Sequence, residues 1–334
     1  MRIFVVKYIV ERNKSLDGLK YILIVFVVIG HFLEPSRYNN QLSCYFYSMI
    51  YSFHMPLFIW LSGYFYKHRT FKEEIQKCIP LLEVCLISHI AFAYLKSGEL
   101  SLRMLLNFAY SPSWYLLSLV CWRLMSSLLL EKISNTQLLV SSIILEFLTF
   151  VAIPNYGGLL SIMRTFQFFP FFVLGYVLKG KLSLITNYKK LIIPIGVISL
   201  AYILYTSCRL QHQVYFQRAG LLEFTEYTDH SLLWIFLFRY SIIISSVFIC
   251  AFVLLFLHDN NVIQKVSKRG QYTLFVYFGQ TLLYPFAVMY CSTLTLSLLA
   301  SAVTIILLTY LSTKQLSNVL MHPIYTLFSK RKTN

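Results

Sequence analysis

Long apolar runs, separated by short polar segments rich in lysine and arginine, recur along the whole 334-residue chain. A helix needs about 20 apolar residues to cross a hydrocarbon core of about 30 Å. The pattern predicts ten spans, over residues 17–33, 47–66, 79–95, 112–130, 138–153, 166–178, 190–207, 232–256, 272–290 and 294–312. The sixth is short and contains Pro170, which predicts a kinked or partly re-entrant segment. The predicted fold class is all-α, a polytopic integral membrane protein.

The positions of lysine and arginine predict how these spans are oriented. With a cytoplasmic N-terminus, 21 of the 29 basic residues fall on the inside and six on the outside, while Arg123 and Arg239 lie within spans. Cytoplasmic connections carry an excess of Lys and Arg in membrane proteins. We therefore expect one transmembrane domain over residues 1–334, with a cytoplasmic N-terminal segment 1–15 and a cytoplasmic tail 313–334.

Composition agrees with a membrane protein and limits the other classes. Hydrophobic residues make up 57% of the chain, charged residues 13%, and the mean hydropathy is +0.65. The formal net charge of +16 is explained by basic cytoplasmic connections facing anionic lipid, so it does not require a nucleic-acid partner. Seven cysteines occur without a CxxC pair, which predicts neither a disulfide framework nor a metal site.

Two titratable residues, His31 and Glu34, stand at the end of the first apolar run, in the stretch IGHFLEPS. At 100° per residue they share one helix face with Asp17 and Lys20, and His31 lies about 16 Å along the axis from Lys20. Polar side chains within spans are costly and often functional. The pattern also fits a simpler arrangement, in which Lys20 reaches the interface and His31 merely ends the helix.

The second span places His54 in FHMPLF, at a depth that matches His31. Two imidazoles at one level of adjacent helices can face a shared cavity, but His54 can equally be a hydrogen-bonded core residue. Ser62 and Gly63 later in this span predict a close helix contact. Arg123 and Arg239 must find partners within the membrane.

Several blocks, in order, carry a resemblance to a known family. They are SLDGLKYILIVFVVIGHFLEP, FHMPLFIWLSGYFYK, SWYLLSLVCWRL, RTFQFFPFFVLGYVLK and RGQYTLFVYFGQTL. Together they resemble the acyltransferase 3 family of integral membrane acyltransferases, in the branch of fucose 4-O-acetylase and other polysaccharide O-acetyltransferases. The resemblance implies a bacterial plasma-membrane enzyme that transfers an acetyl group from cytoplasmic acetyl-CoA to a sugar hydroxyl of a surface glycan or its lipid-linked precursor.

The family motif of a basic residue followed eleven positions later by histidine corresponds to Lys20 and His31, with lysine where the family has arginine. Lysine keeps the charge but lacks the planar guanidinium fork. The resemblance implies that His31 acts either as general base or as transient acyl carrier, with Glu34 and His54 as further catalytic candidates. Gln280 stands where the family often has histidine, so we expect no catalysis there.

The remaining candidates divide between the two substrates. We expect Lys20, Lys67, Arg69, Lys72 and Arg123 to bind the acetyl-CoA donor, although Lys67, Arg69 and Lys72 also fit ordinary positive-inside charge. For the glycan acceptor we expect Trp114, Arg164 and Arg239, where Trp114 also fits a membrane-belt aromatic. No metal is expected, and the oligomeric state is left open.

Two alternatives come from other functional classes. One is a transporter or flippase for saccharide intermediates, with arginine and histidine along its path. The other is an acyl channel that serves a separate transferase. Inverted repeats typical of many transporters are not visible, and the chain contains no GxSxG motif of serine hydrolases. Both observations favour the acyltransferase.

Overall fold

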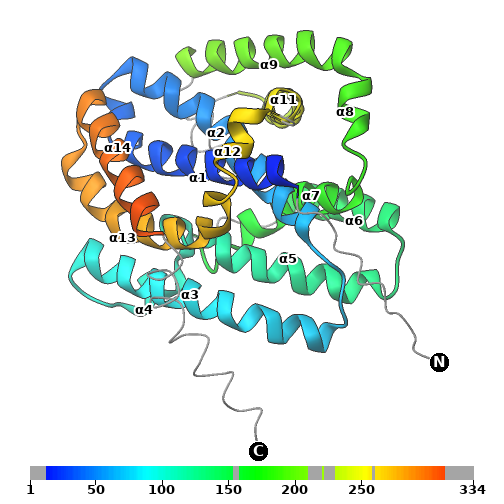
Figure 1. The fold of residues 1–334 in the computed structure, drawn as a ribbon, viewed down its shortest axis with the longest axis horizontal. Helices are drawn as coiled ribbons and strands as arrows, with labels where there is room; N and C mark the ends of the chain where they lie inside the picture. The colour runs from blue at the N-terminus through cyan, green and yellow to red at the C-terminus, as the bar shows by residue number, and fades with distance from the viewer. Residues whose placement is uncertain (1–12, 153–157, 210–219, 222–229, 258–259, 313–334) are drawn as a thin grey trace, which may run out of the picture.

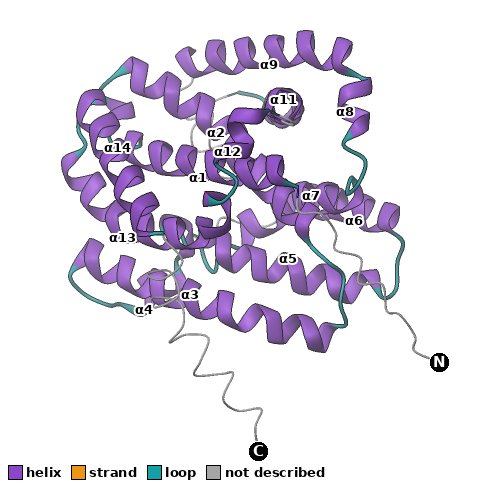
Figure 2. Cartoon of the chain, in the orientation of Figure 1, coloured by secondary structure: helices purple, strands orange, loops and turns teal. Residues whose placement is uncertain are grey.

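The computed structural model describes residues 13–152, 158–209, 220–221, 230–257 and 260–312, and these ranges are helical apart from their connections (Figure 2). The helices are α1 (Lys14–Leu33), α2 (Gln41–Phe65), α3 (Phe71–Ser97), α4 (Leu102–Leu106), α5 (Trp114–Leu130), α6 (Asn135–Ala152), α7 (Ile162–Val177), α8 (Ser183–Asn187), α9 (Lys189–Arg209), α11 (Leu232–Leu257), α12 (Asn261–Lys265), α13 (Thr273–Tyr290) and α14 (Leu294–Leu311). Short 3-10 turns form η1 (Ser36–Tyr38), η2 (Phe108–Tyr110) and η4 (Arg269–Tyr272).

Each of the ten predicted spans falls on one of these helices. Six of them, α1, α3, α6, α9, α11 and α14, are long and apolar enough to cross a membrane, while α5 and α7 are apolar but shorter. α2 and α13 have the length and contain no Asp, Glu, Lys or Arg, but tyrosine and other polar residues lower their hydropathy. The chain is a multi-pass membrane protein, and the number of ten crossings and their orientation stay predictions.

α1 and α2 form the centre of the helix assembly (Figure 1). α1 packs against α2, α12, α13 and α14, and α2 packs in addition against α7, α9 and α11. α3 and α5 pack together and join the assembly through α13 and α7. α11 is seen along its axis in Figure 1 while α1, α3 and α5 run across the view, so the helices do not all share one direction.

The close contact predicted at Gly63 is present. A Cβ on Gly63 would lie 1.8 Å from the carbonyl oxygen of Phe172, and one on Gly175 would lie 1.9 Å from that of Trp60. Glycines therefore let the backbones of α2 and α7 touch on both sides of the contact. This packing fixes α2, which carries His54 and leads into Lys67 and Arg69.

Two local predictions concern proline. α7 is continuous from Ile162 to Val177 with Pro170 inside it, and it is shorter than most of the other long helices. α1 ends at Leu33 with Glu34 as its C-cap, just before Pro35, as the proline predicts. Glu34 therefore stands at the helix end with His31 one turn before it.

Some sequence predictions fall outside the described residues. These are most of the polar connection between Cys208 and Ser231 and nearly all of both terminal segments. The six cysteines whose side chains are described, Cys44, Cys78, Cys85, Cys121, Cys250 and Cys291, are free thiols.

Candidate functional site

A cavity of about 410 Å³ opens between α1, α2, α3, α5 and α13. Small-molecule sites in proteins commonly measure about 300–1,000 Å³. Its wall is mainly apolar and aromatic, with basic side chains contributed by α1, by α5 and by the connection after α2. It is therefore large enough for part of a flexible, anionic molecule.

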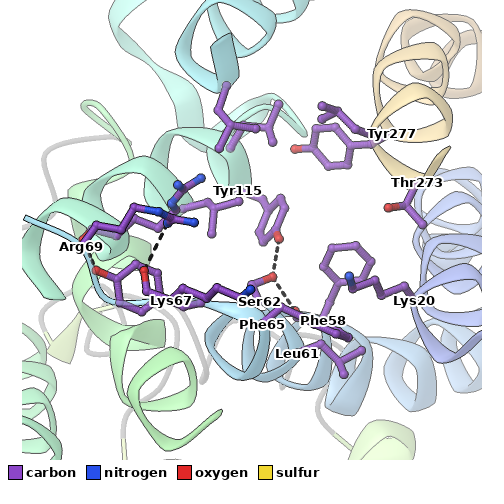
Figure 3. Close-up of a pocket in the computed structure, with 16 residues that line it drawn as sticks. Lys20, Phe58, Leu61, Ser62, Phe65, Lys67, Arg69, Tyr115, Thr273 and Tyr277 are labelled. Carbon is purple, nitrogen blue, oxygen red and sulfur yellow. Dashed lines mark hydrogen bonds between the residues drawn. The ribbon is translucent and has the colours of Figure 1, made fainter. Parts of the chain in front are cut away.

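Four of the five residues predicted to bind the acyl donor line this cavity: Lys20, Lys67, Arg69 and Arg123. In Figure 3, Lys67 and Arg69 approach it from one side and Lys20 from the other. Lys20 also lies over the ring of Phe65, with its Nζ 3.5 Å from the ring centroid, and 3.7 Å from an Asp17 carboxylate oxygen. The fifth, Lys72, is exposed on α3 and is not part of the cavity wall.

Arg69 and Arg123 meet at one acidic residue, Glu74. Arg69 Nη1 donates to Glu74 Oε2 at 3.2 Å, and Arg123 Nε donates to Glu74 Oε1 at 2.5 Å. Glu74 is fully buried in the first turn of α3. The position of Arg123 within a span predicts a charged partner, and Glu74, which precedes the predicted span 79–95, pairs with it.

One further lysine lies near the end of α2. Lys179 Nζ donates to the carbonyl of Tyr66, the C-cap of α2, at 2.9 Å. Partial burial, and after it the positive charge of Lys67, lower the pKa of Lys179 from its ordinary value. The smaller of these two contributions shows that Lys67 and Lys179 lie close enough to repel each other, and an incoming anion relieves that repulsion.

Aromatic rings and hydroxyl groups form the inner wall of the cavity. Ser62 Oγ donates to the carbonyl of Phe58 at 2.9 Å, so the 2.7 Å contact with Tyr115 has the tyrosine hydroxyl as donor (Figure 3). Phe58 packs edge-on against Tyr115, and Tyr277 lies beyond. The wall offers apolar surface with a few fixed hydroxyl groups.

His31 lies in a cluster of aromatic and acidic side chains at the other end of α1. Its ring centroid is 4.8 Å from that of Tyr284, whose hydroxyl donates to Glu34 Oε2 at 2.6 Å. His31 Nδ1 is 3.5 Å from the hydroxyl of Tyr51, at the long limit of a hydrogen bond. The predicted pair of His31 and Glu34 is thus joined through Tyr284 on α13.

His54 belongs to the same cluster. Its ring lies 4.6 Å from that of Tyr51, and the imidazoles of His54 and His31 are close enough to interact electrostatically. His54 is 2% exposed, and its Nδ1 donates to the carbonyl of Ile50 at 2.7 Å. This bond engages Nδ1 with the backbone of α2, so Nε2, on the opposite edge of the ring, points away from that backbone.

A buried arginine beside the cluster carries positive charge towards Glu34. Arg37, in η1, lies over the ring of Tyr47 at 4.3 Å, and Tyr47 stacks on Tyr51. Burial lowers the pKa of Arg37, but Tyr47 and Glu34 together raise it further, so the net direction is upward. Arg37 therefore stays charged, and the Glu34 side chain is one of the groups that stabilise this charge.

The same three helices carry both the cavity and the histidine cluster. α1 carries Lys20 and His31, α2 carries Ser62 and His54, and α13 carries Tyr277 in the cavity wall and Tyr284 in the cluster. Between these two tyrosines, Gln280 is fully buried with no hydrogen-bond partner for its Oε1 among the described residues. The two groups of residues thus lie along one set of helices.

The family to which the chain belongs follows from its sequence relatives. A family model described as an acyltransferase domain, that of acyltransferase 3, matches residues 13–313. The chain belongs to the acyltransferase 3 family.

Two curated relatives of this membrane acyltransferase match shorter regions. Nodulation protein NolL of Sinorhizobium fredii (strain NBRC 101917 / NGR234) is 32% identical over 189 residues, which are 50% of this chain and 49% of the relative. Nodulation protein NolL of Mesorhizobium japonicum (strain LMG 29417 / CECT 9101 / MAFF 303099) is 50% identical over 58 residues, 16% of this chain and 15% of the relative. The matches cover half or less of each relative, and no solved structure matches the acyltransferase.

The predicted acceptor residues of the acyltransferase do not all meet. The guanidinium of Arg164, on α7, lies 5.2 Å from the ring centroid of Trp114 at the start of α5, a cation–π distance. Trp114 adjoins Tyr115 of the cavity wall. Arg239 instead forms an ion pair with Glu146 between α11 and α6, and neither residue lines the cavity.

Three residues of the candidate site, Glu74, Tyr51 and Tyr284, are absent from the sequence predictions. The two tyrosines stand out neither by spacing nor by residue type in a chain with 25 tyrosines. For Glu74, the need of Arg123 for an intramembrane partner was a usable signal, because only 13 acidic residues exist. No group of three His, Cys, Asp or Glu side chains suited to a metal occurs within the described part of the acyltransferase, and the expectation of no metal stays a prediction.

Proposed function

We propose that this membrane acyltransferase is an O-acetyltransferase that moves an acetyl group from cytoplasmic acetyl-CoA to a sugar hydroxyl of a surface polysaccharide or its lipid-linked precursor. The observation that carries the proposal is the cavity with Lys20, Lys67, Arg69 and Arg123 in its wall, on the helices that also carry His31. The resemblance of the sequence to polysaccharide O-acetyltransferases supports a sugar hydroxyl as acceptor.

The cavity suits the donor on both charge and shape. Coenzyme A carries phosphates at one end of a flexible arm and the thioester at the other. Basic side chains favour the phosphates, and the aromatic inner wall around Phe58 and Tyr115 suits the arm. On the proposed orientation the basic mouth faces the cytoplasm, where the donor is made.

A thioester is already activated, so the enzyme chiefly has to remove a proton from the sugar hydroxyl. In this mechanism His31 accepts that proton as the sugar oxygen bonds to the acyl carbon, and returns it to the departing thiolate sulfur. An imidazole can both accept and return a proton near neutral pH, which suits that exchange. Tyr284 holds the imidazole on one side, and Glu34 fixes Tyr284 through the 2.6 Å hydrogen bond.

The experiment is acetyl transfer by the purified protein. Radiolabelled acetyl-CoA and the glycan acceptor are supplied, and incorporation of label into the glycan is measured. We expect incorporation by the wild type and a loss of at least about 100-fold for His31→Ala, the usual size of a general-base contribution. A folded His31→Ala protein with substantial activity rejects His31 as base and as acyl carrier alike.

The same experiment separates the proposal from its alternatives. A flippase or an acyl channel gives no labelled glycan when purified alone. Mass spectrometry of surface glycan from wild-type and deletion cells then identifies the acceptor, because deletion removes one acetyl mass from each modified unit. An unchanged glycan in the deletion strain contradicts the proposal.

A further inference from the structure

Glu74 is a buried carboxylate that two cavity arginines share. Both of its oxygens accept a guanidinium hydrogen bond, Oε2 from Arg69 at 3.2 Å and Oε1 from Arg123 at 2.5 Å. Its side chain is 0% exposed, whereas those of Arg69 and Arg123 are 32% and 17% exposed. The acidic partner is thus hidden behind two basic groups that face the cavity.

The local structure makes this burial tolerable. Glu74 lies in the first turn of α3, whose N-cap is Thr70, and its backbone N–H bonds to the carbonyl of Thr70 at 2.9 Å. The positive end of a helix dipole stabilises an acidic side chain in its first turn. A buried charge must be paired and hydrogen-bonded, and here two guanidiniums meet that need.

The pairing leaves donors available on both arginines. Arg123 uses Nε for Glu74, and its two terminal nitrogens donate to no residue in the described part of the chain. Arg69 bonds Glu74 and the carbonyl of Lys67 through Nη1 alone, so its Nη2 is likewise without a described protein acceptor. Two guanidiniums and one carboxylate also leave a net charge of +1, next to Lys67.

We propose that Glu74 is a positioning residue that holds Arg69 and Arg123 side by side, so that their remaining N–H groups bind the phosphates of the acyl donor. This inference rests on the proposed function and deepens it. Two guanidiniums repel each other in isolation, and a shared carboxylate fixes their separation and direction. The phosphates then meet a fixed pair of guanidinium groups rather than two mobile side chains.

A second buried Glu–Arg pair provides a matched control. Glu146 accepts from Arg239 and, at 3.2 Å, from the hydroxyl of Tyr240, and the pair joins α6 to α11 away from the cavity wall. Glu146→Gln removes a buried carboxylate from an arginine, as Glu74→Gln does. It differs in lying outside the proposed donor site.

The test measures CoA binding to the purified full-length protein by calorimetry. We expect Glu74→Gln to weaken CoA affinity about tenfold, which corresponds to about 1.4 kcal/mol, and Glu146→Gln to leave it within about twofold of the wild type. An unchanged CoA affinity in Glu74→Gln overturns the inference. A wild type that binds no CoA instead contradicts the donor part of the proposed function.

A donor without phosphates separates positioning from a general structural role. With acetyl-CoA we expect Glu74→Gln to raise KM about tenfold and to leave kcat near the wild-type value. With S-acetylpantetheine, which has the thioester but no phosphate, its KM should equal that of the wild type. A KM raised equally for both donors overturns the inference, because a distorted cavity affects both.

Glu74→Asp keeps the experiment decisive if the glutamine variant does not fold. Aspartate retains the charge but is one methylene shorter, so it cannot hold both guanidiniums at their present separation. We expect it to weaken CoA affinity about threefold or more, with Glu146→Asp as its control. Wild-type affinity in Glu74→Asp contradicts the need for this geometry.

Discussion

The ring of Tyr284 lies 4.8 Å from that of His31, while its hydroxyl donates to Glu34 at 2.6 Å. Tyr284 thus connects the proposed base, His31, to the carboxylate of Glu34, the C-cap residue of α1. The histidine is half-buried, so its orientation depends on such neighbours. At the scale of single residues, the proposed chemistry depends on Tyr284 as well as on His31.

Removing only the hydroxyl tests this connection. A hydrogen bond to a charged group contributes about 1.5–3 kcal/mol, so we expect Tyr284→Phe to lower kcat about tenfold while the ring still packs on His31. Acetyl transfer at saturating donor measures the effect. Tyr290→Phe, an exposed tyrosine on the same helix, is the control and should retain wild-type activity. Equal rates in the two variants contradict the role of Tyr284.

The sequence predicts the residues of this site unequally. His31, Lys20, Lys67 and Arg69 are predicted from their positions near the ends of apolar runs, and Arg123 from its position within one, with support from the family blocks. Tyr284 is 250 residues from Glu34, and Glu74 is 49 residues from Arg123. Such partners are brought together by the packing of α1, α3, α5 and α13. The hydropathy pattern along a single sequence does not predict which helices pack against each other.

At the scale of helices, the contact of α2 with α7 holds one wall of the cavity. Phe58 and Ser62 face the cavity, and Gly63 touches the backbone of α7 at Phe172. Sequence patterns predict ten helices and this small-residue contact, because both are local features. The partner of Gly63, Phe172, is distant in sequence and could not be predicted from a local pattern. The same holds for the axis of α11, which runs in a different direction from those of α1, α3 and α5 (Figure 1).

A methyl group at Gly63 should disrupt this contact. The added Cβ would lie 1.8 Å from the carbonyl oxygen of Phe172, and backbone cannot move aside as a side chain does. We expect Gly63→Ala to destabilise the protein by about 3 kcal/mol, at the upper end of overpacking effects. Thermal unfolding of the purified protein in detergent measures the loss.

Gly279 offers a control on α13. Its added Cβ would lie 2.5 Å from the end of the Leu308 side chain, which can change rotamer. Gly279→Ala should therefore cost about 1 kcal/mol. A Gly63→Ala protein as stable as Gly279→Ala shows that α2 and α7 have room to separate.

At the scale of the whole molecule, the proposed orientation decides which substrate enters from which side. Positive-inside counting predicts that the connection after α2, with Lys67, is cytoplasmic, and that the connection after α1, with Asn39, faces the opposite side. With this orientation the basic mouth of the cavity opens towards the cytoplasm, from which the proposed donor approaches. The helices follow from the sequence, but their placement in a bilayer rests on charge alone.

Thiol labelling in intact cells tests this orientation. In a variant with the native cysteines replaced, we expect Asn39→Cys to react with a membrane-impermeant reagent, because Asn39 is exposed and lies on the predicted outer side. Thr70→Cys, also exposed, should react only after the membrane is permeabilised. The reverse pattern inverts the topology and moves the basic cavity mouth to the outer face.

The ion pair between Glu146 and Arg239 also constrains how the chain is made. Its two members are 93 residues apart, so a ribosome completes α6 well before it reaches α11. Until then Glu146 has no guanidinium, and a lone carboxylate in lipid is costly. Nascent chains that stop before α11 should therefore be retained by the insertion machinery or degraded by membrane proteases, whereas chains that include α11 become protease-resistant.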